Sequence, residues 1–110
     1  MNPSRVFEFR TYTAAPGKLE ALKQRFQLHT LGFFAQHNME VVAFFETLEP
    51  DDKLVYILAF SNEKAADDAW AAFTADPGWA VAKAATETDG PLTTKIETRR
   101  FIATDFSPLR

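Results

Sequence analysis

The sequence lacks cysteine entirely and contains only two histidines among its 110 residues. The absence of cysteine excludes disulfide bonds, thiolate nucleophiles and the zinc and iron–sulfur sites that depend on cysteine ligands. His29 and His37 are eight positions apart on one predicted helix, so about 12 Å of helical rise keeps them from sharing a metal. We therefore expect no metal site and no cofactor, and we take a reducing cytoplasm as the default compartment.

The chain also lacks a basic run, a long apolar run and an N-terminal secretory pattern. Its formal net charge is −3, with acidic and basic residues distributed along the whole length. Nucleic-acid binding usually requires a basic patch, and a membrane span requires roughly 20 consecutive apolar residues. These absences predict no nucleic-acid partner and no membrane segment. The length is typical of a single domain, so we assign residues 1–110 to one domain.

Hydrophobic residues make up 46% of the sequence and include eleven phenylalanines, enough for one modest core. Alternation with a period of two predicts strands, whereas spacing of three and four predicts helices. Turn and capping residues then set the boundaries. The predicted elements are a strand over Val6–Thr13, a helix from Lys18 that ends within "QHN" at residues 36–38, strands over Glu40–Leu48 and Lys53–Phe60, a helix beginning after Ser61 or Asn62, a short helix with Asp76 and Pro77 at its start, and a strand over Thr93–Thr104.

This order, β-α-β-β-α-β, is typical of the ferredoxin-like arrangement and gives an α+β fold class. Right-handed crossovers place the two main helices on one face of a four-stranded antiparallel sheet. The strands then run fourth, first, third, second across the sheet. The first and third strands are central, and the other face of the sheet is left bare.

Two patterns bear on that bare face. In the first strand, Glu8, Arg10 and Tyr12 alternate with Phe7 and Phe9, so the polar set lies on the bare face if the two phenylalanines pack under the helices. The third strand is apolar on both of its faces, so it must place one apolar set there as well: either Leu54, Tyr56, Leu58 and Phe60, or Val55, Ile57 and Ala59. A bare apolar face of this extent predicts a homodimer whose sheets pack together into an α+β barrel.

The candidate catalytic residues are, in order of preference, Arg10, Tyr12, Glu8 and His29. Arg10 can bind a carboxylate or enolate, Tyr12 can donate to an oxygen, and Glu8 can hold Arg10 or act as a base. His29 lies on the apolar stripe of the first helix and can act as a base or ligand. The structural alternatives are that Glu8 and Arg10 pair across strands, with Arg100, Arg99 or Glu97, and that His29 is a packed core residue.

Aromatic residues suggest where an apolar ligand would bind. The candidates for the wall of a pocket between helices and sheet are Phe33, Trp70, Phe73 and Trp79. The alternative is that these rings simply pack in the core.

Three stretches resemble the NIPSNAP family of the dimeric α+β barrel superfamily: "FEFRTYTAAPGKLEAL", "HNMEVVAFFET" and "TADPGWAVAK", followed by the closing "TDFSPLR". The resemblance covers nearly the whole chain in the same order. It implies the ferredoxin-like fold and the barrel dimer, and it implies little about chemistry. Other barrel relatives include cofactor-independent monooxygenases, haem-degrading enzymes and lactone isomerases. The family usually has glycine where this chain has Asn38.

Two functional hypotheses follow. The first is a homodimeric protein that binds or converts a small hydrophobic or aromatic organic molecule without a cofactor, by isomerisation or oxygenation. The second is a non-enzymatic homodimeric binding or interaction module. The first requires free volume beside Arg10 or Tyr12, whereas the second predicts that protein partners satisfy these side chains.

Overall fold

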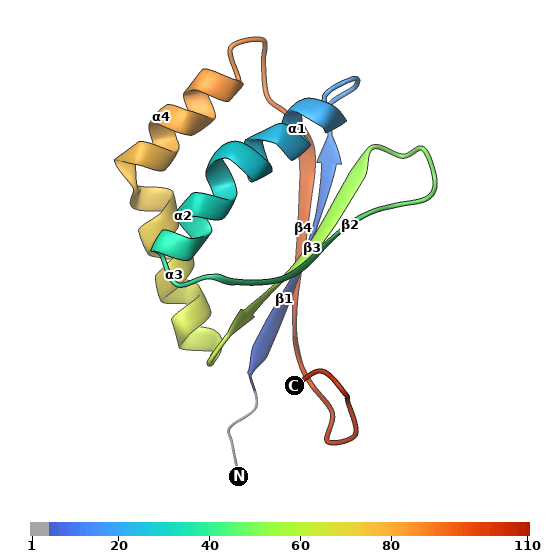
Figure 1. The fold of residues 1–110 in the computed structure, drawn as a ribbon, viewed down its shortest axis with the longest axis vertical. Coiled ribbons are helices and arrows are strands. Elements are labelled where there is room, and N and C mark those ends of the chain that lie inside the picture. Colours follow the sequence, from blue (N-terminus) through green and yellow to red (C-terminus); the bar gives the residue numbers. More distant parts are fainter. Residues whose placement is uncertain (1–4) are drawn as a thin grey trace.

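The computed structural model describes residues 5–110 and confirms the predicted α+β architecture. All pairings in the sheet are antiparallel and the strand order is β2-β3-β1-β4, as predicted. Figure 1 shows the helices gathered on one side of this sheet. The elements are β1 (Val6–Ala14), α1 (Leu19–Arg25), the π-helical segment η1 (Phe26–Thr30), α2 (Leu31–Gln36), β2 (Glu40–Glu46), β3 (Lys53–Phe60), α3 (Glu63–Ala75), α4 (Pro77–Thr86) and β4 (Thr93–Ile102).

The main core lies between the helices and the sheet. Of the two apolar sets on β3, the even-numbered one packs under the helices, and Tyr56 and Leu58 have no exposed surface. Leu22 and Phe34 contribute from the helical layer and are almost completely buried. Because side chains alternate along a strand, the odd-numbered set of β3 must lie on the bare face.

The first helical region differs from the single regular helix that the sequence predicts. It contains a π-turn, in which the backbone N–H of Leu31 donates to the carbonyl of Phe26, five residues earlier. The buried Thr30 hydroxyl donates to the carbonyl of Arg25 across the same spacing, at 3.3 Å, and so stabilises the wider turn. Gly32, the residue least favourable to a helix, lies just after the irregular segment and continues into α2.

The second helical region begins at the predicted caps. The Asn62 side chain accepts a hydrogen bond from the backbone N–H of Ala65 at 2.7 Å, which starts α3. The Asp76 side chain accepts one from Gly78 at 2.8 Å, and Pro77 occupies the first turn of α4. A side chain at Ncap that accepts from the second or third N–H satisfies a donor that the helix cannot. The two caps fix where each helix begins.

The face of the sheet away from the helices carries phenylalanines. Phe7, Ile57 and Ala59 form a small cluster there, and the Phe9 and Phe101 rings meet edge to face with centroids 4.9 Å apart. The condition that would place Glu8, Arg10 and Tyr12 on the bare face, Phe7 and Phe9 packing under the helices, is therefore not met. Beneath the helices, Trp70 and Arg100 donate the hydrogen bonds that the buried Glu8 carboxylate requires.

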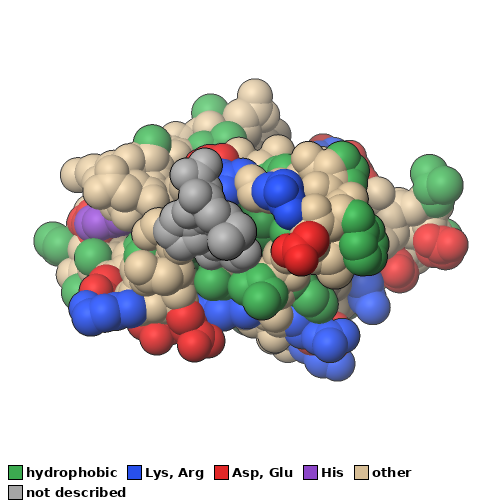
Figure 2. All heavy atoms as spheres, turned by 90° about the horizontal axis from the view of Figure 1, so that it is seen from below, with side chains coloured by type: hydrophobic (Ala, Val, Ile, Leu, Met, Phe, Trp, Pro, Cys, Tyr) green, Lys and Arg blue, Asp and Glu red, His purple; other side chains and the backbone are tan. Residues whose placement is uncertain are grey.

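Surface charge shows no single-sign face in the view of Figure 2, where acidic and basic side chains are interspersed with hydrophobic ones. Within residues 5–110, none of the helices has both the length and the apolar character that crossing a bilayer demands.

The predicted left-handed residue after the first helical region is confirmed, since Asn38 has φ of 59°.

Candidate functional site

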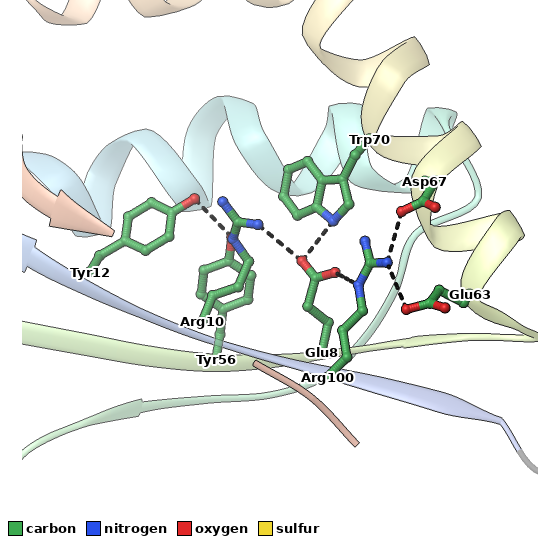
Figure 3. A network of polar contacts seen from close by, with 8 residues as sticks. All are labelled: Glu8, Arg10, Tyr12, Tyr56, Glu63, Asp67, Trp70 and Arg100. Carbon is green, nitrogen blue, oxygen red and sulfur yellow. Dashed lines mark hydrogen bonds and ion pairs between the residues drawn. The ribbon is translucent and has the colours of Figure 1, made fainter. Parts of the chain in front are cut away.

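The three polar side chains of β1 point into the layer between sheet and helices (Figure 3). Glu8, Arg10 and Tyr12 share one strand face, as the alternation predicts. Their cross-strand neighbours on β3 are Leu58, Tyr56 and Leu54, all of them buried. The polar set therefore lies beneath the helices of the same chain and not on the bare face of the sheet.

Glu8 is the centre of a hydrogen-bonded network and has no exposed surface. Its Oε2 accepts from Arg10 Nη1 at 2.9 Å and from the indole N–H of Trp70 at 2.7 Å. Its Oε1 accepts from Arg100 Nε at 2.9 Å. Both carboxylate oxygens are therefore engaged, and the two guanidinium groups balance the buried charge. This arrangement is that of a group that holds its neighbours in position.

Arg100 extends the network from the sheet to α3. It lies beside Glu8 in the β1–β4 register, and its Nη1 donates to Asp67 at 2.7 Å and lies 3.7 Å from Glu63. The hydrogen bond to Asp67 raises the pKa of Arg100, and the Glu8 carboxylate adds to this effect despite some desolvation. Of the three cross-strand partners that the sequence allows for Glu8, the structure selects Arg100.

Arg10 has few polar partners for a partly buried cation. Its guanidinium carbon lies 4.0 Å from the centroid of the Trp70 ring and 5.6 Å from that of Tyr12. Within the described residues, its Nε atom is buried without a hydrogen-bond partner. Desolvation alone would lower the pKa of Arg10, but the Tyr12 and Tyr56 phenols and Glu8 outweigh it and raise the pKa. Arg10 is therefore a fixed cation with unused donor capacity.

Tyr12 and Tyr56 form the other end of the network. The Tyr56 hydroxyl donates to the Tyr12 oxygen at 2.9 Å, and the two rings are 5.4 Å apart. Burial raises the pKa of Tyr56 well above its ordinary value, so this phenol keeps its proton. Because the Tyr12 oxygen accepts this bond, its own hydroxyl hydrogen stays free to be donated.

Arg10 lies next to β4, one of the two edge strands of the sheet. Thr98 and Ile96 are the β4 neighbours of Arg10 and Tyr12 on the helix side, and both are exposed. The side chain of Arg10 retains 15% of its surface. Arg10 is thus a member of the polar set that solvent reaches, whereas Glu8 is sealed.

The structure does not bring His29 into this network. His29 lies in η1 and lines a separate groove of about 200 Å³ with Arg25, Leu28 and Thr86. That groove shares no residue with the Glu8 network. A catalytic role for His29 in concert with Arg10 therefore has no geometric support, and His29 is a partly exposed helix residue rather than a core one.

The four aromatic residues predicted to wall a pocket are Phe33, Trp70, Phe73 and Trp79, and they pack on one another. The ring centroid of Phe73 lies 4.8 Å from that of Trp79 and 5.4 Å from that of Trp70. The centroids of Phe33 and Trp79 are 6.1 Å apart. These contacts join α2, α3 and α4. Trp70 alone also reaches the polar network. Whether the cluster lines a ligand site stays a prediction.

The sequence pattern does not predict several members of these networks. Asp67 and the Tyr56 hydroxyl join the Glu8 network, and Arg25 pairs with Glu87 at 2.9 Å beside α4. The predicted strand order places β3 beside β1, and a register that sets Tyr56 opposite Arg10 would have indicated that Tyr56 belongs to the network. Arg25 and Glu87 are 62 positions apart, and no periodicity or motif in the sequence predicts that they pair.

Metal binding has no candidate within the described part of the chain. In residues 5–110, no three side chains of His, Asp or Glu are grouped so that they could hold an ion. The groups available at the site are a buried cation and a phenol beside an indole ring.

A family model and the solved structures that resemble this chain point to the same family. The NIPSNAP family model matches residues 7–108. A NIPSNAP family protein with unknown function from Agrobacterium tumefaciens shares 25% identity, with TM-score 0.85 over 100% of this chain and 97% of that one. An uncharacterized NIPSNAP-like domain protein from Burkholderia xenovorans shares 17% identity, with TM-score 0.83 over 98% and 91%.

A more distant likeness is to a mutant form of SnoaB, a cofactor-independent oxygenase from Streptomyces nogalater. It shares 24% identity, with TM-score 0.60 over 94% of this chain and 97% of that one. Among curated proteins the search found no match. The SnoaB likeness extends to the fold alone.

Proposed function

This chain belongs to the NIPSNAP family, and we propose that it works as a homodimer whose two sheets pack bare face to bare face into one α+β barrel. The dimer serves as a binding or interaction module, and its buried polar network holds α3 on the sheet. The NIPSNAP family membership supports the fold of each half. The proposal of a dimer rests on the bare face itself.

The single observation that carries the dimer is the set of phenylalanines on that face. Phe9 and Phe101 are 38% and 40% exposed, and Phe45 on β2 is 53% exposed. Phe101 lies opposite Phe7 and Phe9 lies opposite Ile57, whereas Phe45 lies farther along the same face opposite Val55, so apolar residues of all four strands share this face. A second copy would remove these rings from water, at roughly 25 cal/mol per Å² of apolar surface buried.

Charge placement supports the same interface. Arg99, Glu97 and Lys95 of β4 share the face of Phe101, and they lie along one edge of the sheet. An apolar centre with a charged rim is the usual layout of a stable protein interface. The saturated Glu8 supports the module rather than an enzyme with Glu8 as its base.

Light scattering coupled to gel filtration tests the dimer. We expect twice the chain mass of 12.4 kDa for the wild type. Phe9→Asp places a carboxylate in the interface and should give a monomer that remains folded by circular dichroism. Val81→Asp is the matched control, because Val81 is exposed on α4, away from the sheet. A wild-type mass of 12.4 kDa would sink the proposal.

A second candidate function has one observation in its favour, the unused donors of Arg10 and Tyr12. A buried cation and a free phenol proton beside an indole ring suit the oxygen of an aromatic carboxylate or enolate. Any reaction there would be an isomerisation or oxygenation that needs no cofactor. The name of SnoaB agrees with this class, but at 24% identity it supports only the fold.

Titration calorimetry with 2-naphthoate tests this candidate. Binding should weaken about tenfold or more in Arg10→Gln, the loss of roughly 1.4 kcal/mol. Arg99→Gln is the control, because Arg99 lies on β4 facing the other side of the sheet. Equal affinity in all three proteins would exclude an anion site at Arg10 and leave the interaction module.

A further inference from the structure

A pocket between the first helical region and β2 has the features of a ligand site that is separate from the Glu8 network. Its volume is about 310 Å³, within the range of small-molecule sites. From the described residues it takes its walls from α1, η1, α2, β2 and β3. We propose that it binds a small neutral aromatic molecule that carries one hydroxyl or amine donor, such as a phenol.

The apolar walls set the aromatic part of the ligand. Phe26 and Phe44 meet edge to face with centroids 5.2 Å apart, and both line the pocket together with Leu54. Leu31 also lines it and is 36% exposed, so it lies where the pocket opens to solvent. Aromatic rings pack well against walls of this kind, which offer both ring faces and ring edges. A flat ring system would cover apolar surface that is now partly open to water.

The π-turn places two of these walls. The backbone N–H of Leu31 donates to the carbonyl of Phe26, so one π hydrogen bond joins the two pocket residues. The extra residue rotates everything after it by about 100° relative to a regular helix. Single π-turns inside helices occur frequently at functional sites. The irregularity here therefore coincides with the pocket and aims Leu31 at it.

The charged residues at one end set the polar part of the ligand. Lys23 lies 3.0 Å from Glu46 and 3.1 Å from Glu20, so two carboxylates surround one ammonium group. The local net charge is negative, which disfavours an anionic ligand. Glu46 uses Oε2 for Lys23, so its other oxygen can accept a hydrogen bond from a hydroxyl or amine of the ligand.

The pocket and the Arg10 site thus differ in the charge they select. The Arg10 site offers a cation and a phenol proton to an oxyanion, whereas this pocket offers a carboxylate oxygen to a neutral donor. Two probes with the same ring system separate them: 2-naphthol, which is neutral near neutral pH, and 2-naphthoate, which is an anion. Both can be followed by their own fluorescence.

The experiment is a fluorescence titration of the full chain with 2-naphthol. We expect saturable binding that weakens about tenfold or more in Leu31→Trp, which fills the pocket mouth. Leu28→Trp is the matched control, because Leu28 is exposed two residues from the pocket-lining Phe26 but faces a different groove, and binding should stay within about twofold of wild type. Gln27→Trp fills the same mouth from an exposed position and should repeat the loss if Leu31→Trp folds poorly.

Three outcomes would overturn the proposal. The first is the absence of saturable 2-naphthol binding to the wild-type protein. The second is unchanged affinity in folded Leu31→Trp and Gln27→Trp variants, which would place the probe elsewhere, such as on the bare sheet face. The third is a parallel loss of 2-naphthoate binding in the same variants, which would show that the pocket does not select neutral ligands.

Discussion

The two faces of the same four-stranded sheet meet opposite requirements. On the helix face, β1 contributes Glu8, Arg10 and Tyr12, and the carboxylate receives three hydrogen bonds. On the bare face, the same strand contributes Phe7 and Phe9, whose neighbours are apolar residues of β3. The helix face of β1 therefore carries the charged residues and the opposite face carries the phenylalanines, the reverse of the usual arrangement for a strand with one covered face.

The difference between the faces shows that a helical layer over charged residues must supply hydrogen-bond partners for them. Beneath the helices, α3 brings Trp70 and Asp67 within hydrogen-bonding distance of the sheet residues Glu8 and Arg100, so buried charges can be satisfied. Within residues 5–110 no helices cover the bare face, and a second copy packed there, as proposed, would bring more phenylalanine to its centre. Apolar residues suit that contact because they need no specific partner.

The largest effect is expected at the centre of the helix face. Glu8→Ala removes the acceptor for two guanidinium groups and an indole, and it should lower the free energy of unfolding by about 3–5 kcal/mol. Urea denaturation measures this. Glu49→Ala is the control, because Glu49 is an exposed carboxylate in the turn between β2 and β3 and belongs neither to the Glu8 network nor to the proposed interface. A loss under about 1 kcal/mol would mean that the network is not a stabilising centre.

A smaller effect is expected at Arg10. Arg10→Ala removes one of the two cations at Glu8, but Arg100 and Trp70 still donate to the carboxylate. We expect a loss of about 1–3 kcal/mol in the free energy of unfolding, the cost of one charged hydrogen bond. Urea denaturation of Arg10→Ala and Glu8→Ala measures which variant loses more of the free energy of unfolding. If Arg10→Ala costs more than Glu8→Ala, the charge balance at Glu8 depends on Arg10 rather than on both guanidinium groups.

The sequence predicts the fold well because its signals are local and periodic. Asn62 and Asp76 mark the two helix starts, and the element order determines the strand order. It does not decide which face of β1 lies under the helices, since Phe7 and Glu8 alternate equally on either assignment. That choice depends on Trp70, which lies 62 positions away along the chain from Glu8. The π-turn is likewise supported by the hydrogen bond from the Thr30 hydroxyl to the Arg25 carbonyl, which the periodicity of the sequence does not predict.

The bare face has its own test, through concentration. If two copies share this face, dimer formation contributes to stability, and a tenfold increase in protein concentration adds about 1.4 kcal/mol. The melting temperature of the wild type should therefore rise with concentration, and that of Phe9→Asp should not. Calorimetry over a hundredfold range of concentration measures both. A wild-type melting temperature independent of concentration would contradict the shared face.

At the phenol end of the helix face the expected effect is smaller still. Tyr56→Phe removes the hydrogen bond from the Tyr56 hydroxyl to Tyr12 and keeps the ring stacked on Phe44. We expect a loss of about 1 kcal/mol in the free energy of unfolding, the usual worth of one neutral hydrogen bond. Urea denaturation of Tyr56→Phe measures it. A loss above about 3 kcal/mol would show that the hydroxyl supports Arg10 as well.

The smallest effect concerns the link between α2 and α4, behind the helix face. His37 Nε2 lies 2.7 Å from Asp76 Oδ2, and this contact, with the hydrogen bond from Gly78, lowers the pKa of Asp76. A folded-state pKa below the unfolded value of about 3.9 means that the contribution is complete above that value and is lost as the pH falls through the folded pKa.

Asp76→Asn tests this link, because asparagine still caps α4 and does not titrate. Below about pH 4, the stability of the wild type should fall more steeply with decreasing pH than that of Asp76→Asn. Urea denaturation at a series of acidic pH values measures the two slopes. Asp89→Asn, at an exposed position in the loop after α4, should keep the wild-type slope. Identical slopes in all three proteins would mean that the His37–Asp76 contact does not cause the acid sensitivity.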